Sequence, residues 1–185
     1  GYPILGVTIT GGIPPLEEAT AMLTEFHRAG ICLNSLKVGG DGDIKRALAI
    51  AEALPEQTII IQVEGGKAGG HHSATPLESI LKRHYGKLRN HPNVLLAAGG
   101  GVATKEQVAA LLYGTWSEGP APRPVDAVFV GTVLMACAEA HTSPAVKRNL
   151  AKLSGGDSLL SYGQSSGGIV SGRSGLDADI YYIEN

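Results

Sequence analysis

Residues 58–73 have the sequence TIIIQVEGGKAGGHHS, in which a run of β-branched residues leads into a glycine-rich loop and two histidines. The run at 58–63 has the length and composition of a buried parallel strand. The loop at 64–73 therefore follows the carboxyl end of a strand, where parallel α/β folds bind ligands. Its glycines would let the backbone approach a flat or phosphorylated ligand closely. The alternative interpretation is a flexible turn followed by surface histidines.

The rest of the chain repeats this order of strand, small-residue loop and helix. The predicted strands are residues 4–10, 31–38, 58–63, 93–98 and 126–130, and the predicted helices are residues 16–29, 41–54, 77–89, 104–112, 134–139 and 144–153. Strands that alternate with helices at such spacings predict a parallel sheet of right-handed βαβ units. The loops that follow the strands then all lie at one edge of the sheet.

Two of these loops favour phosphate binding. The glycine turn at 99–101 precedes the helix that begins near Thr104, whose backbone N–H groups and positive end attract an anion. The turn at 131–132 follows one strand later, and such a pair of loops occurs after strands seven and eight of (β/α)8 barrels. The sequence thus predicts an α/β fold that is the C-terminal part, about strands 4–8, of a (β/α)8 TIM barrel. Taken alone, a glycine triplet is equally consistent with a tight turn.

The chain divides into two predicted parts. Residues 1–153 form the partial TIM barrel, and residues 154–185 form a Gly/Ser-rich C-terminal extension that packs on the barrel through apolar residues at 169–170 and 180–183. The segment at 113–125 is too rich in proline for regular structure and is either a surface excursion or a lid or partner contact. The first residues lack a starting methionine, which suggests a piece of a longer protein.

Composition limits the classes of function. A length of 185 residues allows one sizeable domain but is short of the roughly 250 residues of a complete barrel. The net charge of −2 and the 17% of charged residues argue against nucleic acid and an anionic membrane as partners. Cys32 and Cys137 stand far apart, and no apolar run reaches the roughly 20 residues of a membrane span, so we expect a cytoplasmic protein.

The segment from Gln62 to Ser73 resembles the flavin-site loop of the FMN-dependent enoyl reductase domain in type I fatty acid synthases of the actinobacterial and fungal kind. Its AGGH core at 68–71 is shared with nitronate monooxygenases, which belong to the same TIM barrel superfamily, whereas the double histidine followed by serine is more specific. The similarity extends from residues 6–9, through 37–39, to 140–144 and 167–174. Val38 departs from the family, whose members often have proline there.

The resemblance implies a function for the chain. Residues 1–153 would be part of an FMN-binding enoyl reductase domain that reduces 2-enoyl thioesters with NADPH, the enoyl-ACP reductase step of fatty acid synthesis. The substrate would be presented on acyl carrier protein, and the other domains of an oligomeric fatty acid synthase multienzyme would be partners. Two alternatives stay open: a nitronate monooxygenase-like FMN oxidase, and a structural fragment that is inactive without the missing half-barrel.

The predicted site residues follow from the loop positions and the resemblance. His71 would protonate the substrate α-carbon, and the neighbouring His72 would have a structural or substrate-orienting role. Lys37 ends a buried strand, where an unpaired ammonium is costly, so it would face the flavin N1 and O2 atoms or else extend to the barrel rim. Gln62 would contact the flavin ring edge or be a satisfied core amide. The predicted cofactor-binding residues are Lys37, Gln62, Gly69, Gly70, Gly99, Gly100, Gly101, Gly131 and Thr132, the last five at the FMN phosphate.

Weaker hypotheses concern other polar residues. Lys67 and Arg173 could meet NADPH phosphates, although a solvated loop lysine is the better interpretation of Lys67. No metal site is expected, because adjacent histidine side chains seldom converge on one ion and no cysteine or carboxylate completes a familiar spacing.

Overall fold

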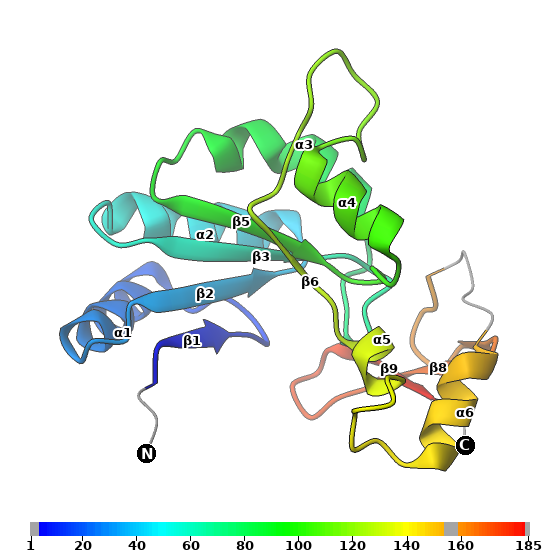
Figure 1. The fold of residues 1–185 in the computed structure, drawn as a ribbon. Helices are drawn as coiled ribbons and strands as arrows, with labels where there is room; N and C mark the ends of the chain where they lie inside the picture. The colour runs from blue at the N-terminus through cyan, green and yellow to red at the C-terminus, as the bar shows by residue number, and fades with distance from the viewer. Residues whose placement is uncertain (1–3, 154–158, 184–185) are drawn as a thin grey trace.

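The structure is a computed structural model that describes residues 4–153 and 159–183. It contains a parallel sheet of five strands in the order β1-β2-β3-β5-β6 and an antiparallel sheet of four strands in the order β4-β9-β8-β7 (Figure 1). The second sheet lies at the end of the first toward which the strand arrows of β2, β3 and β5 point. The C-terminal part of the chain therefore lies beside the carboxyl edge of the parallel sheet.

The parallel sheet confirms the predicted strands. They are β1 (Gly6–Ile9), β2 (Leu33–Val38), β3 (Ile59–Glu64), β5 (Val94–Gly99) and β6 (Ala127–Phe129). Each strand pairs in parallel with its neighbour, and Lys37 lies opposite Gln62 in the β2–β3 register. This order is what successive βαβ units produce, so the α/β class is shown.

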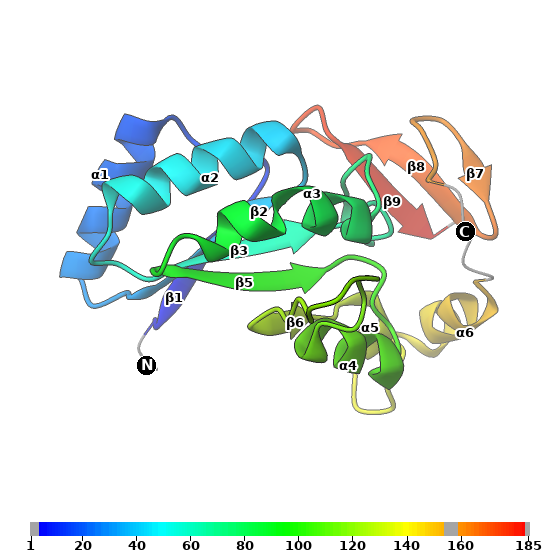
Figure 2. The same ribbon diagram turned by 90° about the horizontal axis from the view of Figure 1, so that it is seen from above.

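Helices cover one face of this sheet. The helices are α1 (Leu16–Arg28), α2 (Asp41–Ala53), α3 (Leu77–Arg89), α4 (Lys105–Tyr113), α5 (Thr132–Met135) and α6 (Pro144–Lys152). Figure 2 shows α1, α2 and α3 on the same side of the sheet. Ile59, Ile61 and Val63 alternate along β3 toward these helices and are fully buried in the hydrophobic core. None of the helices in the described part of the chain is long and apolar enough to cross a membrane.

The helix predicted at 134–139 is the largest error in the helix boundaries. In the structure α5 begins at Thr132 and ends at Met135. The carbonyl groups of Cys137 and Ala138 instead accept hydrogen bonds from the Lys147 ammonium, at 2.5 and 3.2 Å. A side chain from α6 thus satisfies carbonyl groups of the turn that follows α5.

The opposite face of the parallel sheet has no helix layer in Figures 1 and 2. Leu33 and Leu95 point to this side and are 52% and 42% exposed. Within the described residues, β1 pairs only with β2 and β6 pairs only with β5, so the sheet is open. Closure into a TIM barrel stays a prediction.

The proline-rich segment after α4 has no regular structure, as predicted. Gly114, with φ of 76°, ends α4 in the left-handed conformation. The segment is fastened by polar contacts: the Trp116 indole donates to the Arg123 carbonyl at 2.6 Å, and the Tyr85 hydroxyl of α3 donates to the Pro124 carbonyl at 2.8 Å. Arg89 of α3 adds an ion pair with Asp126 at 2.6 Å. The bond from Trp116 closes the excursion on itself, and the contacts from Tyr85 and Arg89 hold its C-terminal end against α3.

The C-terminal extension contains strands that the sequence did not reveal. They are β7 (Ser165–Ser166), β8 (Ile169–Arg173) and β9 (Asp179–Ile183), and β9 pairs with β4 (Gly70–His71). Serine and glycine concealed β7 and weakened the pattern of β8, whereas β9 (DIYYI) contains neither and was read only as an apolar anchor. The start of the predicted extension, at 154–158, lies outside the described residues.

Candidate functional site

The loops that follow β3, β5 and β6 pack against one another at the carboxyl edge of the parallel sheet. A Cβ atom on Gly101 would lie 2.5 Å from the Lys67 Cβ atom, and one on Gly100 would lie 2.6 Å from the Gly65 nitrogen. A Cβ atom on Gly69 would collide with the Thr132 hydroxyl. Glycine is required at these contacts because the backbones approach so closely. The structure therefore brings the predicted glycine loops and the histidine loop together.

Lys37 lies at this edge and forms an ion pair that the sequence analysis missed. Its ammonium is 2.5 Å from the Glu64 carboxylate, and the two side chains are 22% and 9% exposed. The premise that the Lys37 ammonium is unpaired was thus wrong. Burial raises the pKa of the Glu64 carboxyl, against the opposing effect of Lys37. The signal was present, since Glu64 follows Gln62 by two residues in β3 and so shares its face.

Gln62 belongs to a row of polar side chains across three strands. Its amide nitrogen donates to the Ser35 hydroxyl of β2 at 2.9 Å, and Ser35 in turn donates to the Thr8 hydroxyl of β1 at 2.7 Å. This row lies on the face without helices and ends beside the Lys37–Glu64 pair in the β2–β3 register. The amide nitrogen of Gln62 is accordingly satisfied by protein, as the alternative interpretation of this residue proposed.

His71 is held by the β8–β9 hairpin. Its backbone lies in β4, opposite Ile180 of β9. Its ring nitrogen Nε2 is 2.7 Å from the hydroxyl oxygen of Ser174, which follows β8. Ser174 lies 103 residues further along the chain, so the contact could not be read from local sequence.

His72 makes different contacts from its neighbour. Its ring stacks on Tyr181 of β9, with the ring centroids 3.6 Å apart and the planes inclined by 18°. Nδ1 donates to the Ser73 carbonyl at 2.9 Å. The buried Nε2 atom has no hydrogen-bond partner within the described residues. The stack and the backbone bond are contacts expected of a structural residue.

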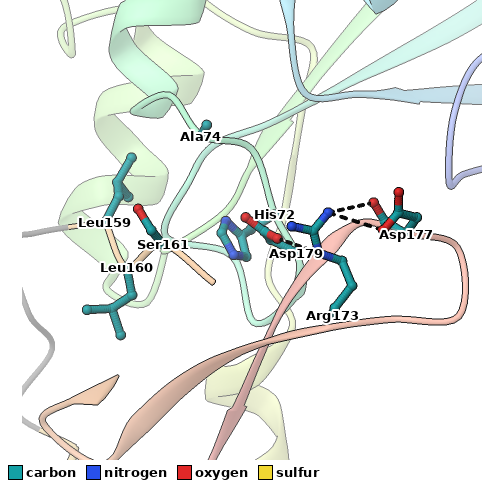
Figure 3. A pocket seen from close by; sticks show the side chains of 8 residues that line it. All are labelled: His72, Ala74, Leu159, Leu160, Ser161, Arg173, Asp177 and Asp179. Atoms are coloured by element: carbon teal, nitrogen blue, oxygen red, sulfur yellow. Dashed lines mark hydrogen bonds and ion pairs between the residues drawn. The ribbon is translucent and has the colours of Figure 1, made fainter. Parts of the chain in front are cut away.

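A cavity of about 340 Å³ lies beside His72, on the side of the C-terminal sheet (Figure 3). Its lining residues are His72, Ala74, Leu159, Leu160, Ser161, Arg173, Asp177 and Asp179. Arg173 is paired with Asp177 and Asp179, each at 3.3 Å. Because two carboxylates balance its charge, this pairing counts against the hypothesis that Arg173 meets a phosphate of NADPH.

The start of α4 is less open to a phosphate than the sequence suggested. The Thr104 hydroxyl accepts from the Gln107 backbone at 3.2 Å, and the Gln107 side chain accepts from the backbone N–H groups of Ala103 and Thr104. This capping box uses donors that a phosphate would need. Gly131 offers more room, since a Cβ atom placed there would meet nothing within 4 Å. The donors that fit an FMN group are therefore the Lys37 ammonium and the turn at Gly131, since the Gln62 amide nitrogen already donates to Ser35.

Residues 58–185 match a family model described as fatty acid synthase subunit beta/Fas1-like, helical. The fatty acid synthase beta subunit pigK of Monascus ruber is 38% identical over 189 residues, and the fatty acid synthase subunit beta of Saccharomyces cerevisiae is 34% identical over 189 residues. Each alignment covers 99% of this chain but 9% of the relative. The chain belongs to the fatty acid synthase subunit beta/Fas1-like family.

Proposed function

We propose that this chain carries part of the active site for NADPH- and FMN-dependent reduction of 2-enoyl thioesters within a larger fatty acid synthase. Membership of the fatty acid synthase beta family supports the pathway. The observation that carries the specific step is the convergence of the His71 loop with the glycine turns beside the Lys37–Glu64 pair. FMN, when bound, supplies hydride transfer from NADPH to the β-carbon of the substrate.

His71 has the proton-transfer role in this proposal. The reaction needs an acid at the substrate α-carbon, and an imidazole can carry a proton near neutral pH. His71 lies on a loop fixed by backbone pairing to β9, which limits its movement. His72, whose ring stacks on Tyr181, supports the loop from the other side.

Lys37 and Gln62 would bind the flavin ring edge. The Lys37 side chain is 22% exposed at the strand end, and Glu64 supplies its counter-charge. The Gly131 turn would receive the phosphate, with Gly99, Gly100, Gly101 and Thr132 forming the surrounding wall. These residues would orient the cofactor against His71 and would leave the chemistry to the cofactor and substrate.

The partners in this proposal are acyl carrier protein and the remaining domains of the synthase. The chain spans about 9% of the length of the curated relatives that it matches. We infer that other parts of the protein cover the exposed face of the parallel sheet and complete a barrel, since Leu33 and Leu95 are exposed there.

Substitution of His71 tests the proposed step. In the full-length protein, His71→Ala should retain FMN absorbance but lower NADPH-dependent reduction of a crotonyl thioester at least about a hundredfold. His141→Ala is the matched control, because this histidine is exposed and lies outside the site. Full turnover by His71→Ala would remove His71 from the proton-transfer role, and nitronate oxidation without enoyl reduction by the wild type would favour the monooxygenase alternative.

A further inference from the structure

The turn between β8 and β9 delivers a hydroxyl group to His71. The strands pair in antiparallel fashion from Ile169–Ile183 to Arg173–Asp179. Beyond Arg173, the Ser174 backbone nitrogen donates to the Ala178 carbonyl at 2.9 Å and the Asp177 nitrogen donates to the Ser174 carbonyl at 3.0 Å. The turn thus fixes both backbone groups of Ser174. Its side chain points toward β4, where the hydroxyl lies beside His71.

The Ser174 hydroxyl has the hydrogen-bonding capacity to hold His71 in one orientation. Its oxygen accepts from the Leu176 backbone nitrogen at 3.2 Å and lies 2.7 Å from the His71 Nε2 atom. A hydroxyl oxygen has two lone pairs, so it can accept from Leu176 and from an Nε2–H group at once. The backbone pairing of His71 with Ile180 keeps the two side chains in register.

We propose that Ser174 is the positioning residue for His71 and that it engages Nε2 so that Nδ1 delivers the proton. This inference rests on the proposed enoyl reduction. After hydride addition at the β-carbon, the electron pair at the substrate α-carbon takes the Nδ1 proton, and the N–H electron pair stays on the ring. The imidazolium thereby becomes the neutral form with its hydrogen on Nε2, which Ser174 already accepts. The step requires no rearrangement of the hydroxyl.

Three serine variants in the full-length protein test this assignment by kinetics. Ser174→Ala should lower kcat for crotonyl-thioester reduction about tenfold with little change in KM, because a freed ring is less often oriented for transfer. Its solvent deuterium isotope effect on kcat should rise, since proton transfer becomes slower. Ser174→Thr keeps the hydroxyl and should stay within about threefold of wild type. Ser165→Ala, an exposed serine of β7, should have no effect.

The contact itself can be tested without turnover. Diethyl pyrocarbonate modifies accessible imidazole nitrogens, and tandem mass spectrometry resolves His71 from His72. We expect faster modification of His71 in Ser174→Ala, with the exposed His141 as internal reference. Unchanged modification, or a wild-type kcat in Ser174→Ala, would overturn the inference. Absence of enoyl reduction in the wild type would refute the proposed function, and the modification rates would still decide whether Ser174 holds His71.

Discussion

Lys37 and Glu64 show how one buried carboxylate changes the interpretation of a strand end. Lysine at the end of a buried strand predicts a ligand contact, because an unpaired ammonium is costly to bury. In the structure Glu64 is the more desolvated member of the pair. Its side chain is 9% exposed, and burial raises the pKa of its carboxyl. Lys37 keeps more of its hydration and can still meet a ligand at the site.

The raised pKa of Glu64 gives a prediction about stability. A carboxyl whose pKa is higher in the folded protein takes up its proton there first, so its contribution to the free energy of unfolding falls as pH rises above the ordinary value of 4.5. We expect Glu64→Gln to be more stable than wild type at neutral pH, because the amide lacks the desolvated charge that raises the carboxyl pKa. The difference should vanish below pH 4.5.

Thermal unfolding of the full-length protein between about pH 4 and about pH 8 measures this difference, because this range begins below the ordinary pKa of 4.5 and extends through the raised pKa of Glu64. Glu106→Gln is the matched control, because Glu106 pairs with Lys105 at 3.8 Å on the exposed surface of α4. A clear loss of stability in Glu64→Gln at neutral pH would mean that the attraction to Lys37 exceeds the desolvation of Glu64.

At the scale of elements, the β8–β9 hairpin and the histidine loop form one unit although about a hundred residues separate them in sequence. Tyr181 makes two of the contacts in this unit. Its ring stacks on His72, and its hydroxyl accepts from the Leu160 nitrogen at 2.8 Å and lies 3.3 Å from the Leu160 carbonyl. The tyrosine thereby joins the histidine loop to the segment that enters the C-terminal sheet.

Substitutions of Tyr181 should separate these two contacts. Tyr181→Leu removes the ring and should lower the stability of the histidine loop by about 0.5–1.5 kcal/mol beyond the loss of buried area. Tyr181→Phe keeps the stack and removes the hydroxyl, so exchange should increase mainly near Leu160. Hydrogen–deuterium exchange of peptides covering 64–75 and 159–164 in the full-length protein measures both effects. Equal protection of 64–75 in Tyr181→Leu and wild type would show that the stack does not hold the loop.

At the scale of the whole molecule, α1, α2 and α3 cover one face of the parallel sheet, and no helix layer from residues 4–153 or 159–183 covers the other. A parallel sheet normally has both faces covered, because its strands are apolar on both sides. Leu95 on the open face is 42% exposed, whereas neighbouring residues on the helix side of β5, such as Leu96, are fully buried. This asymmetry motivates the inference that another part of the protein packs on the open face.

Charged substitutions on this face test the inference. Leu95→Asp should destabilise the full-length protein by about 1–3 kcal/mol if the face is covered there, because an unpaired carboxylate would be buried. Leu112→Asp on α4 is the matched control, since Leu112 is 40% exposed in the described structure. Thermal unfolding of both variants measures the contrast. Equal, small effects would show that the Leu95 face stays in contact with water.

The sequence by itself determined the order of strands and helices. β-Branched runs such as residues 59–61, and helix signals such as Pro76 before α3, are local features that specify element type within a few residues. The common edge of the loops follows from the parallel order, so the meeting of the histidine loop with Gly101 and Thr132 was also predictable.

Only the tertiary structure decided which side chains hold the candidate site in place. Ser174 and Tyr181 carry no distinguishing local pattern. Alternation along β3 places Glu64 on the face of Gln62, but only the pairing of two strands brings it to Lys37. Their roles arise because distant segments are brought within hydrogen-bonding and stacking distance. Such contacts depend on the full set of packing energies rather than on the local preferences of the backbone, and so they cannot be read from neighbouring residues.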